Sequence, residues 1–325
     1  MAALRPMTDG VVTIRPFMTG DSPTLVAGRD ETFHRFLGPG SDDPRPVGCI
    51  VVNDQVVGWV DYDVDCTWLE PGEVNLGYNL FAPHRGQGYA TRAVQLLMHH
   101  LAVDTEHQTA TLLIHPQNHR SLALAARARF TAHGQLDGSR YFQRPVPPLT
   151  YTDATVTIRW PSTDDLDADL EAKDDAQMDW LWRPGERQSW AAMTSEEQRA
   201  HALLGLRANH RAFGTGPKWT FAVDAADAPC VAYIDCDLAN EHVPPGEANV
   251  SYSSHPAHRG RGYVSSAVRL LTQFLADHTG ARLAHLVVDE GNVASLRVAA
   301  AVGARATERW STHAGRVMIR HVMPI

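Results

Sequence analysis

The chain has 325 residues, of which 44% are hydrophobic and 20% charged, and its formal net charge is −8. This length exceeds what one hydrophobic core usually serves, so we expect two globular domains and no long disordered segment. The acidic balance argues against a nucleic-acid-binding surface, because such a surface normally carries a basic excess.

The sequence shows no pattern of an export signal or a membrane span. It opens MAALRPMTDG, without an apolar core segment, and it holds no run of about eighteen apolar residues. We therefore expect a cytoplasmic protein. The four cysteines, at positions 49, 66, 230 and 236, show no C-x-x-C spacing, and we assign them no role.

An internal repeat divides the chain into two copies of one domain. VTIRP, at residues 12–16, recurs as VTIRW at 156–160, which is an offset of 144 residues. VVGWVDYDV, at 56–64, recurs as CVAYIDCDL at 230–238, which is an offset of 174. A period of this length indicates a duplicated domain, and copy two carries about thirty extra residues after its first strand.

The two copies differ most between their first and second strands. In copy one, residues 17–46 are rich in Asp, Gly and Pro, so we expect little more than one brief helix there. In copy two, Leu166 and Leu170 lie four apart after a Ser or Thr cap, which predicts a helix. Thr194 is the expected N-cap of a second, longer helix with acidic residues in its first turn.

Three strands follow in each copy, and then a helix, a strand, a helix and two strands. We place the three strands at residues 47–52, 56–64 and 73–80 in copy one and at 219–223, 230–238 and 247–253 in copy two. The next helix has apolar residues at helical spacing, namely Ala90, Ala93, Val94, Leu97 and Leu101, or Ala267, Val268, Leu271 and Leu275. This order is typical of a mixed α/β fold. We place the domains at residues 1–146 and 154–325, with the Pro-rich segment 147–153 as linker.

The best-matched stretch of the repeat surrounds a glycine-rich loop. PGEVNLGYNLFAPHRGQGYATRAVQLLMHHL, from Pro71, aligns without a gap with PGEANVSYSSHPAHRGRGYVSSAVRLLTQFL, from Pro245, and fifteen of the thirty-one positions are identical. A strand that leads through such a loop into a helix presents unpaired N–H groups to an anion, so we expect a phosphorylated cofactor. No Gly-Lys-Ser/Thr follows, and Thr91 and Ser265 replace the third glycine of the dinucleotide fingerprint.

Arg85, Gly88 and Ala90 match R-x-x-G-x-A, which in this position resembles the acetyl-CoA-binding motif of the GNAT family of N-acyltransferases. NHRS from Asn118 and NVAS from Asn292 resemble the start of that family's fourth helix, and SLRVAAAVGA is similar to the branch that acetylates protein N-termini and related amines. The resemblance covers nearly the whole chain. It implies two consecutive GNAT-like domains, each a mixed, mostly antiparallel twisted sheet flanked by helices.

The resemblance also implies the cofactor and its contacts. The cofactor is acetyl-CoA, held by the two loops and the two asparagines. The implied contacts are Arg259, Gly260, Arg261, Gly262, Tyr263, Val264, Ser265 and Asn292 in copy two, and Arg85, Gly86, Gln87, Gly88, Tyr89, Ala90, Thr91 and Asn118 in copy one. No metal is assigned, because the His115 and His119 pair has no evident third ligand.

The implied reaction is direct transfer of acetyl to a primary amine of a small molecule or peptide, within a ternary complex. An ammonium ion must first lose its proton, and Glu247, or Glu73 in copy one, is the candidate base. Ser295, or Ser121, is the candidate proton donor to the departing thiolate. Each also has a structural reading: the glutamates as solvated strand-edge residues, and the serines and asparagines as helix caps.

The copies depart from the family pattern at different positions. Copy one has Ala90 where copy two has the bulkier Val264, but copy one lacks a full first helical region and has Arg129 where copy two keeps Gly303. We therefore expect copy two to catalyse, with copy one binding CoA weakly or serving as a structural partner.

Other readings stay open. Copy one could be the active copy, or the chain could be a non-catalytic acyl-CoA-binding module. Trp180, Trp182 and Trp190 could line the acceptor pocket or belong to the core. The expected partner is an amine acceptor, with no nucleic acid and no membrane, and the protein could be a monomer with an internal pseudo-dimer or a homodimer.

Overall fold

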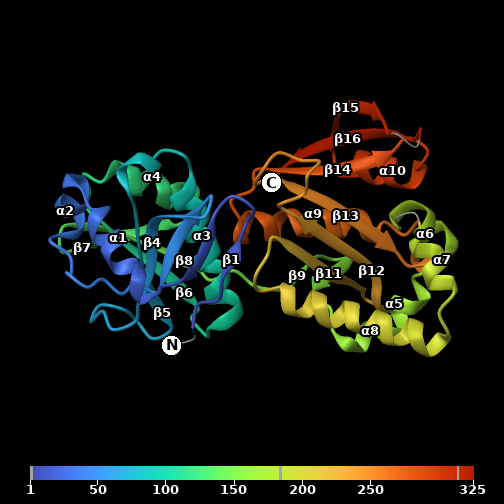
Figure 1. Ribbon diagram of the computed structural model, residues 1–325, viewed down its shortest axis with the longest axis horizontal. Helices are drawn as coiled ribbons and strands as arrows, with labels where there is room; N and C mark the ends of the chain where they lie inside the picture. The colour runs from blue at the N-terminus through green and yellow to red at the C-terminus, as the bar shows by residue number, and fades with distance from the viewer. Residues whose placement is uncertain (1–2, 183–184, 313–314) are drawn as a thin grey trace. The chain divides into compact units, whose positions relative to one another are not determined.

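The computed structural model describes residues 3–182, 185–312 and 315–325. The chain divides into two compact units (Figure 1): unit 1 is Met1–Pro148 with Asp277–Gly280, and unit 2 is Leu149–Ala276 with Ala281–Ile325. They contain copy one and copy two. Each unit has one sheet, of eight strands in the described residues, with flanking helices. The predicted α/β fold class is therefore confirmed.

The sheet of unit 1 has the order β1-β2-β3-β4-β5-β6-β8-β7. All neighbours are antiparallel except β5 and β6, which are parallel. The strands are β1 Met7–Thr8, β2 Thr13–Pro16, β3 Gly48–Val52, β4 Gln55–Asp63, β5 Glu73–Leu80, β6 Thr109–Ile114, β7 Thr131–Leu136 and β8 Ser139–Pro145.

The sheet of unit 2 repeats this order as β9-β10-β11-β12-β13-β14-β16-β15, with β13 and β14 as its parallel pair. Tyr151 and Thr152, within the segment we expected to be a linker, form β9 and pair with β10. The strands are β9 Tyr151–Thr152, β10 Val156–Arg159, β11 Lys218–Ala225, β12 Ala228–Asp237, β13 Ala248–Ser254, β14 Leu283–Asp289, β15 Arg305–Ser311 and β16 Val317–Pro324.

The helices lie between the strands as the sequence pattern predicts in the second half of each copy. None of those in the described residues is long and apolar enough to cross a membrane. Unit 1 has α1 Ser22–Ala27, α2 Glu31–Leu37, α3 Tyr89–Asp104 and α4 His119–Arg127. Unit 2 has α5 Leu166–Glu171, α6 Asp175–Leu181, α7 Glu186–Ala191, α8 Ser195–Ala212, α9 Tyr263–His278 and α10 Val293–Ala301.

The first helical region of copy one is fuller than we predicted. It holds α1 and α2 in place of one brief helix, and three of the Pro and Gly residues that we took as helix breakers lie at the helix ends. Pro23 is in the first turn of α1, where its missing N–H costs no hydrogen bond. Gly28 and Gly38 follow the last residues of α1 and α2. The expectation of little more than one brief helix was therefore wrong, although the region remains shorter than that of copy two, which adds α7 and α8.

The offset of 144 residues that relates the first strands continues through this region. It relates the 3-10 turn Thr19–Asp21 to Thr163–Asp165, α1 to α5, and α2 to α6. The extra residues of copy two are therefore the helices α7 and α8, which come after the repeated part.

An ion pair recurs at the same offset. Arg15 binds both carboxylate oxygens of Asp21 at 2.7 Å, and Arg159 binds those of Asp165 at 2.7 and 3.0 Å. The Arg15 guanidinium lowers the pKa of Asp21 to about 2. In both units this pair ties the first long strand to the turn that opens the helical region.

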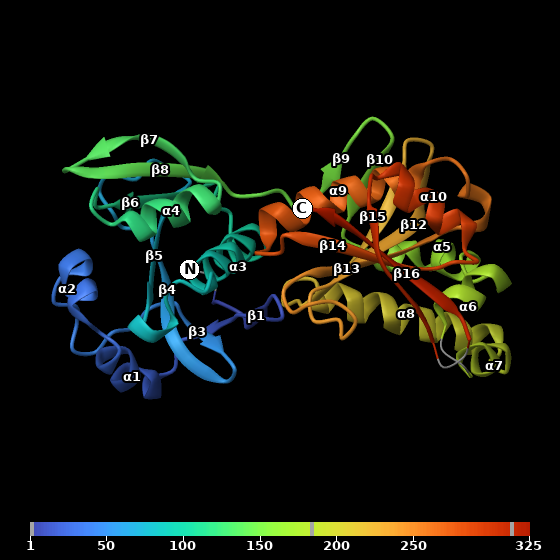
Figure 2. The ribbon, with the colours of Figure 1, turned by 90° about the horizontal axis from the view of Figure 1, so that it is seen from above.

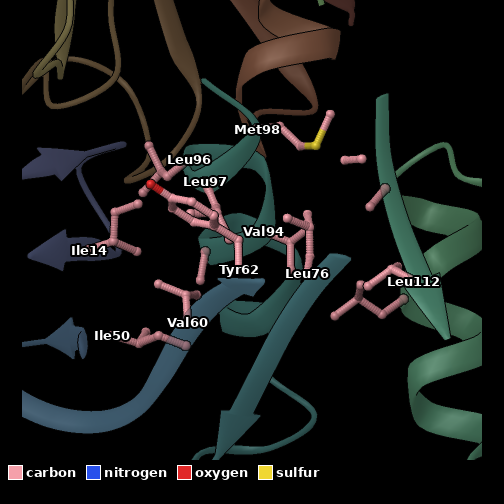
Figure 3. Close-up of a cluster of buried hydrophobic side chains, with 14 of the residues drawn as sticks. Ile14, Ile50, Val60, Tyr62, Leu76, Val94, Leu96, Leu97, Met98 and Leu112 are labelled. Carbon is pink, nitrogen blue, oxygen red and sulfur yellow. The ribbon is translucent and has the colours of Figure 1, made fainter. Parts of the chain in front are cut away.

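The core of unit 1 lies between its sheet and α3 (Figure 3). Val60 and Leu76 of the sheet meet Val94 and Leu97 of α3, and all four are almost completely buried. The predicted apolar stripe of α3 therefore packs on the sheet, with Ala90 only partly buried at its start.

In unit 2 the sheet is covered on both faces (Figure 2), with α9 and α10 on one side and α5, α6 and α8 on the other. Phe274 of α9 packs edge-on against Trp219 and Phe221 of β11, with ring centroids 5.8 and 4.7 Å apart. On the opposite face, Tyr233 of β12 packs against the apolar cluster of α5 and α8 that includes Leu206. Successive side chains of a strand point to opposite faces of the sheet, so one strand can contribute side chains to the packing on both faces.

The predicted N-cap of α8 is present. Thr194 Oγ1 accepts a hydrogen bond from the Glu197 N–H at 3.3 Å, and Glu197 Oε2 accepts one from the Thr194 N–H at 2.8 Å. We expect Thr194→Ala to lower the free energy of unfolding by about 1 kcal/mol, because the Glu197 N–H at the helix start loses its side-chain acceptor. Urea unfolding of the full chain measures this change. Thr194→Ser keeps the cap and should stay close to wild type; an equal loss in both variants would contradict the capping role.

Candidate functional site

The parallel strand pair of each unit opens into a fork. In the part of the chain that the structure describes, β13 and β14 pair only at Ala248–Ala284 and Asn249–His285, although β13 runs on to Ser254. In unit 1, β5 and β6 pair from Glu73–Thr109 to Asn75–Thr111. A sheet that opens in this way leaves backbone groups facing the gap, and a bound ligand can satisfy them.

The glycine-rich loop follows the open end of the first fork strand. Gly260 and Gly262 have φ of 76° and 82°, and Gly86 and Gly88 have φ of 81° and 84°. These left-handed conformations favour glycine, and a side chain added at any of the four would project into open space. The loop therefore turns the chain into α9, or α3, with the first helical N–H groups unpaired within the helix and available to an anion, as predicted.

A cavity of about 530 Å³ lies at this loop in unit 2. Its wall contains every residue that we predicted to contact the cofactor in copy two, together with Ser295. The remaining wall comes from α6, from the end of β13, from α10 and from His258, just before the loop. The volume lies in the range of small-molecule sites.

The arginine of the R-x-x-G-x-A motif does not point freely into the cavity. Both terminal nitrogens of Arg259 bind the carboxylate of Asp174, at 2.6 and 2.7 Å, and its Nε donates to the Ser254 carbonyl oxygen at 3.2 Å. Arg85 repeats this arrangement with Asp30, at 2.6 and 2.9 Å. Sequence reasoning missed both aspartates, although they are related by the 144-residue offset.

Ser295, in the first turn of α10, lies beside Tyr252 of β13. Burial raises the pKa of Tyr252, and the hydrogen bond to Ser295 opposes that shift. In unit 1, burial raises the pKa of Tyr78 to about 12, again against the effect of Ser121. A phenol and a serine hydroxyl thus lie together in both copies. The tyrosines are identical at the 174-residue offset, a signal that the sequence contained.

Asn292 and Asn118 are helix N-caps. The carboxamide oxygen of Asn292 accepts from the Ser295 N–H at 3.0 Å, and that of Asn118 accepts from the Ser121 N–H at 3.2 Å. The carboxamide oxygens of both asparagines therefore serve as helix caps, as the structural alternative predicted. Asn292 also lines the cavity.

The two candidate bases have different partners. Glu247 immediately precedes β13, outside the cavity wall, and its carboxylate is hydrogen-bonded to Nε2 of His285. His285 is 5% exposed and stands at the last paired position of the fork. Glu73 instead accepts from the Tyr141 hydroxyl at 3.1 Å and from Gln143. Sequence reasoning missed these partners because they come from other strands, and His285 has no counterpart at Thr111.

The three tryptophans of the helical region have different environments. Trp180 of α6 lines the cavity and is 41% exposed. Trp190 is buried and packs edge-on against Trp182, with ring centroids 5.6 Å apart. The ligand-lining reading therefore fits Trp180, and the core reading fits Trp190.

Of the two histidines that we considered for metal binding, His115 packs against an aromatic side chain. The ring of His115 lies 5.6 Å from that of Phe36 in α2. Among the described residues, no group of three or more His, Cys, Asp or Glu side chains is arranged to hold a metal ion.

A family model described as "Acetyltransferase (GNAT) domain" matches the chain twice, at residues 29–131 and 155–305. No curated protein matches the sequence. Among solved structures, RimJ of Mycobacterium smegmatis with CoA-disulfide is 19% identical, with 52% of this chain and 81% of that chain covered and a TM-score of 0.43.

Two further solved structures are similar to the chain. A GNAT-family acetyltransferase from Bacillus anthracis is 14% identical, with 54% and 98% of the two chains covered and a TM-score of 0.43. The Salmonella typhimurium enzyme that modifies the N-terminal serine of ribosomal protein L7/L12 is 15% identical, with 53% and 96% covered and a TM-score of 0.41.

Proposed function

Because the chain belongs to the GNAT acetyltransferase family, with two of its domains in tandem, we propose that unit 2 transfers acetyl from acetyl-CoA to a primary amine of a small molecule or peptide. Family membership makes the chain an acyltransferase with acetyl-CoA as its donor. One observation supports the choice of unit 2: the 530 Å³ cavity, whose wall holds the Arg259–Ser265 loop, Asn292 and Ser295 together.

The loop of unit 2 fits a pyrophosphate. Its glycines expose backbone N–H groups, and the start of α9 adds the positive end of a helix dipole. Arg261 and Arg297 also line the cavity and add positive charge. Because Arg259 is paired with Asp174, we assign the phosphate contact in this loop to the backbone and not to the Arg259 side chain.

The proposed chemistry uses residues on both sides of the fork. Glu247 first accepts one proton from the substrate ammonium, and the neutral amine nitrogen then bonds to the carbonyl carbon of the acetyl-CoA thioester. As the C–S bond breaks, the nitrogen loses its second proton, which reaches the departing thiolate through the Ser295 hydroxyl. His285 holds the Glu247 carboxylate at the closed end of the fork. The Ser295 hydroxyl donates a hydrogen bond to the departing thiolate, and amide groups of β13 that face the gap stabilise the oxyanion.

Thiol release from acetyl-CoA, measured with a panel of primary amines, tests this function. The panel contains alkyl diamines, amino acid amides and short peptides with free N-termini. We expect at least one class to accelerate thiol release above the amine-free rate and to gain one acetyl group by mass spectrometry. If acetyl-CoA binds by calorimetry and no amine accelerates release, the proposed function is wrong and the chain is an acyl-CoA-binding module.

A further inference from the structure

The helix α6 is fastened at its start to the cofactor loop. Asp174, its N-cap, accepts a hydrogen bond from the Gln177 N–H at 2.9 Å and at the same time binds Arg259 through both carboxylate oxygens. Arg259 in turn donates to the Ser254 carbonyl oxygen, at the end of β13. One carboxylate therefore joins the helix, the loop and the first fork strand.

The same helix is fastened near its other end to the second fork strand. The Arg316 guanidinium lies over the Trp180 ring, 5.1 Å from its centroid, and Arg316 Nε donates to Asp289 at 2.6 Å. Asp289 is the last residue of β14. The helix thus runs from the end of β13 to the end of β14, across the open side of the fork.

Unit 1 has the same arrangement with different residues. Asp30, the N-cap of α2, binds Arg85, and Phe36 packs on His115, just beyond the end of β6. Both helices therefore have an aspartate as N-cap and an aromatic residue six positions after it, and these residues are related by the 144-residue offset. The individual contacts differ, but in both copies the helix is attached at its start by an Asp–Arg pair and near its end by an aromatic side chain. This repetition favours a functional role for the arrangement over an incidental ion pair at the surface.

We propose that α6 is a strap across the fork and that Asp174 is a positioning residue, which sets the helix and the cofactor loop in place together through Arg259. The inference rests on the proposed function for unit 2. Gln177 and Trp180 of α6 share the cavity wall with the loop, so movement of the strap alters the site for acetyl-CoA and the approach of the amine. In this assignment the motif arginine anchors the strap and does not bind phosphate.

The pair remains ionised in the pH range of the reaction. Arg259 lowers the pKa of Asp174, and Arg85 lowers that of Asp30 to about 2. A carboxylate with a lowered pKa in the folded state contributes its stabilisation above its ordinary pKa of about 4 and loses it only as the pH falls through the lowered value. A pH profile measured between about 6 and 9 therefore does not reflect titration of this pair.

A double-mutant cycle of Asp174→Asn and Arg259→Gln tests the proposal. Asparagine is as good an N-cap as aspartate, so Asp174→Asn keeps the helix start and removes only the charge. We expect each single variant to weaken acetyl-CoA binding about fivefold, and the double variant to be no weaker than either, because both remove the same interaction. The KM for the amine should rise by a similar factor, whereas kcat should change little.

The fluorescence of Trp180 gives the affinity at the unit 2 cavity without any turnover. Acetyl-CoA is titrated into wild type and into Trp180→Phe, and the change in fluorescence is compared. The part of the change that is absent in Trp180→Phe comes from Trp180 and therefore reports binding at the unit 2 cavity. Asp30→Asn, the matched change in unit 1, should leave both the unit 2 affinity and the amine KM unchanged.

Three results would overturn the strap. The first is a much larger loss of affinity in Arg259→Gln than in Asp174→Asn with additive effects, which would mean that the arginine contacts the cofactor itself. The second is a changed thermal midpoint of Asp174→Asn with unchanged affinity and KM, and the third is an equal effect of Asp30→Asn. If no amine is acetylated, the proposed function fails, but the fluorescence cycle still decides the role of Asp174.

Discussion

Glu247→Gln is expected to lower kcat by about two to four orders of magnitude and to leave the affinity for acetyl-CoA unchanged. Glutamine has the same shape and keeps an oxygen that can accept from His285, so the strand and the fork should stay in place. It cannot accept a proton from the ammonium. Because Glu247 lies outside the cavity wall, we expect no change in cofactor binding. Steady-state kinetics and calorimetry on the same preparation measure the two quantities.

The matched control is Glu73→Gln, at the equivalent position of unit 1. Glu73 is held by Tyr141 and Gln143, and its replacement should alter kcat less than twofold if unit 2 carries the reaction. A large loss in Glu73→Gln with near-normal Glu247→Gln would transfer the active site to unit 1. Small effects in both variants would show that neither glutamate is the base.

The effect of Glu247→Gln should also depend on pH. An alkyl primary amine has a pKa of about 10. At a pH below that value, its neutral, nucleophilic fraction increases tenfold for each unit by which the pH rises. A variant without a base depends on this fraction. We therefore expect the difference between wild type and Glu247→Gln to shrink as the pH rises from about 7 toward 10; a constant ratio would indicate that Glu247 acts by a route other than proton removal.

Features set by neighbouring residues in the chain could be predicted from the sequence. The glycines of the loops, the capping asparagines and Thr194, and the apolar stripe of α3 and α9 all depend on contacts within a few positions. Each strand between 47 and 80 and between 219 and 253 lies within a few residues of its predicted place. The residues around a glycine that needs a positive φ, or around an N-cap, largely determine that local structure.

Contacts between distant elements could not be predicted in the same way. Glu247 was chosen from its place before the loop, but its partner His285 comes from β14, and a pattern within one strand carries no information about the neighbouring strand. Arg259 was assigned to the cofactor from its motif, and its pairing with Asp174 depends on where α6 crosses the fork. The repeat did contain a usable signal, because Asp30 and Asp174 keep the offset of the first strands.

Gly262→Val is expected to weaken acetyl-CoA binding at unit 2 by about ten- to a hundredfold and to abolish most of the turnover. Gly262 has φ of 82°, a conformation that costs a β-branched residue about 1–3 kcal/mol. A side chain there meets no protein atom within 4 Å and projects into open space at the loop. The new methyl groups therefore occupy the place where a phosphate must approach the backbone amides, so binding should suffer more than folding. Calorimetry and thiol release measure the two losses.

Gly88→Val makes this expectation selective, because the two positions are matched in conformation. Gly88 has φ of 84° and also faces open space, so valine costs about the same in backbone strain at either site, and that shared cost cancels in the comparison. The remaining difference in turnover between the two variants then shows how much each loop contributes to the reaction. Turnover that survives Gly88→Val and not Gly262→Val assigns the working cofactor site to unit 2, although copy one has the smaller Ala90 beside its loop; the reverse result assigns it to unit 1. Equal losses would mean that both loops must be intact for one reaction, and would contradict a single working copy.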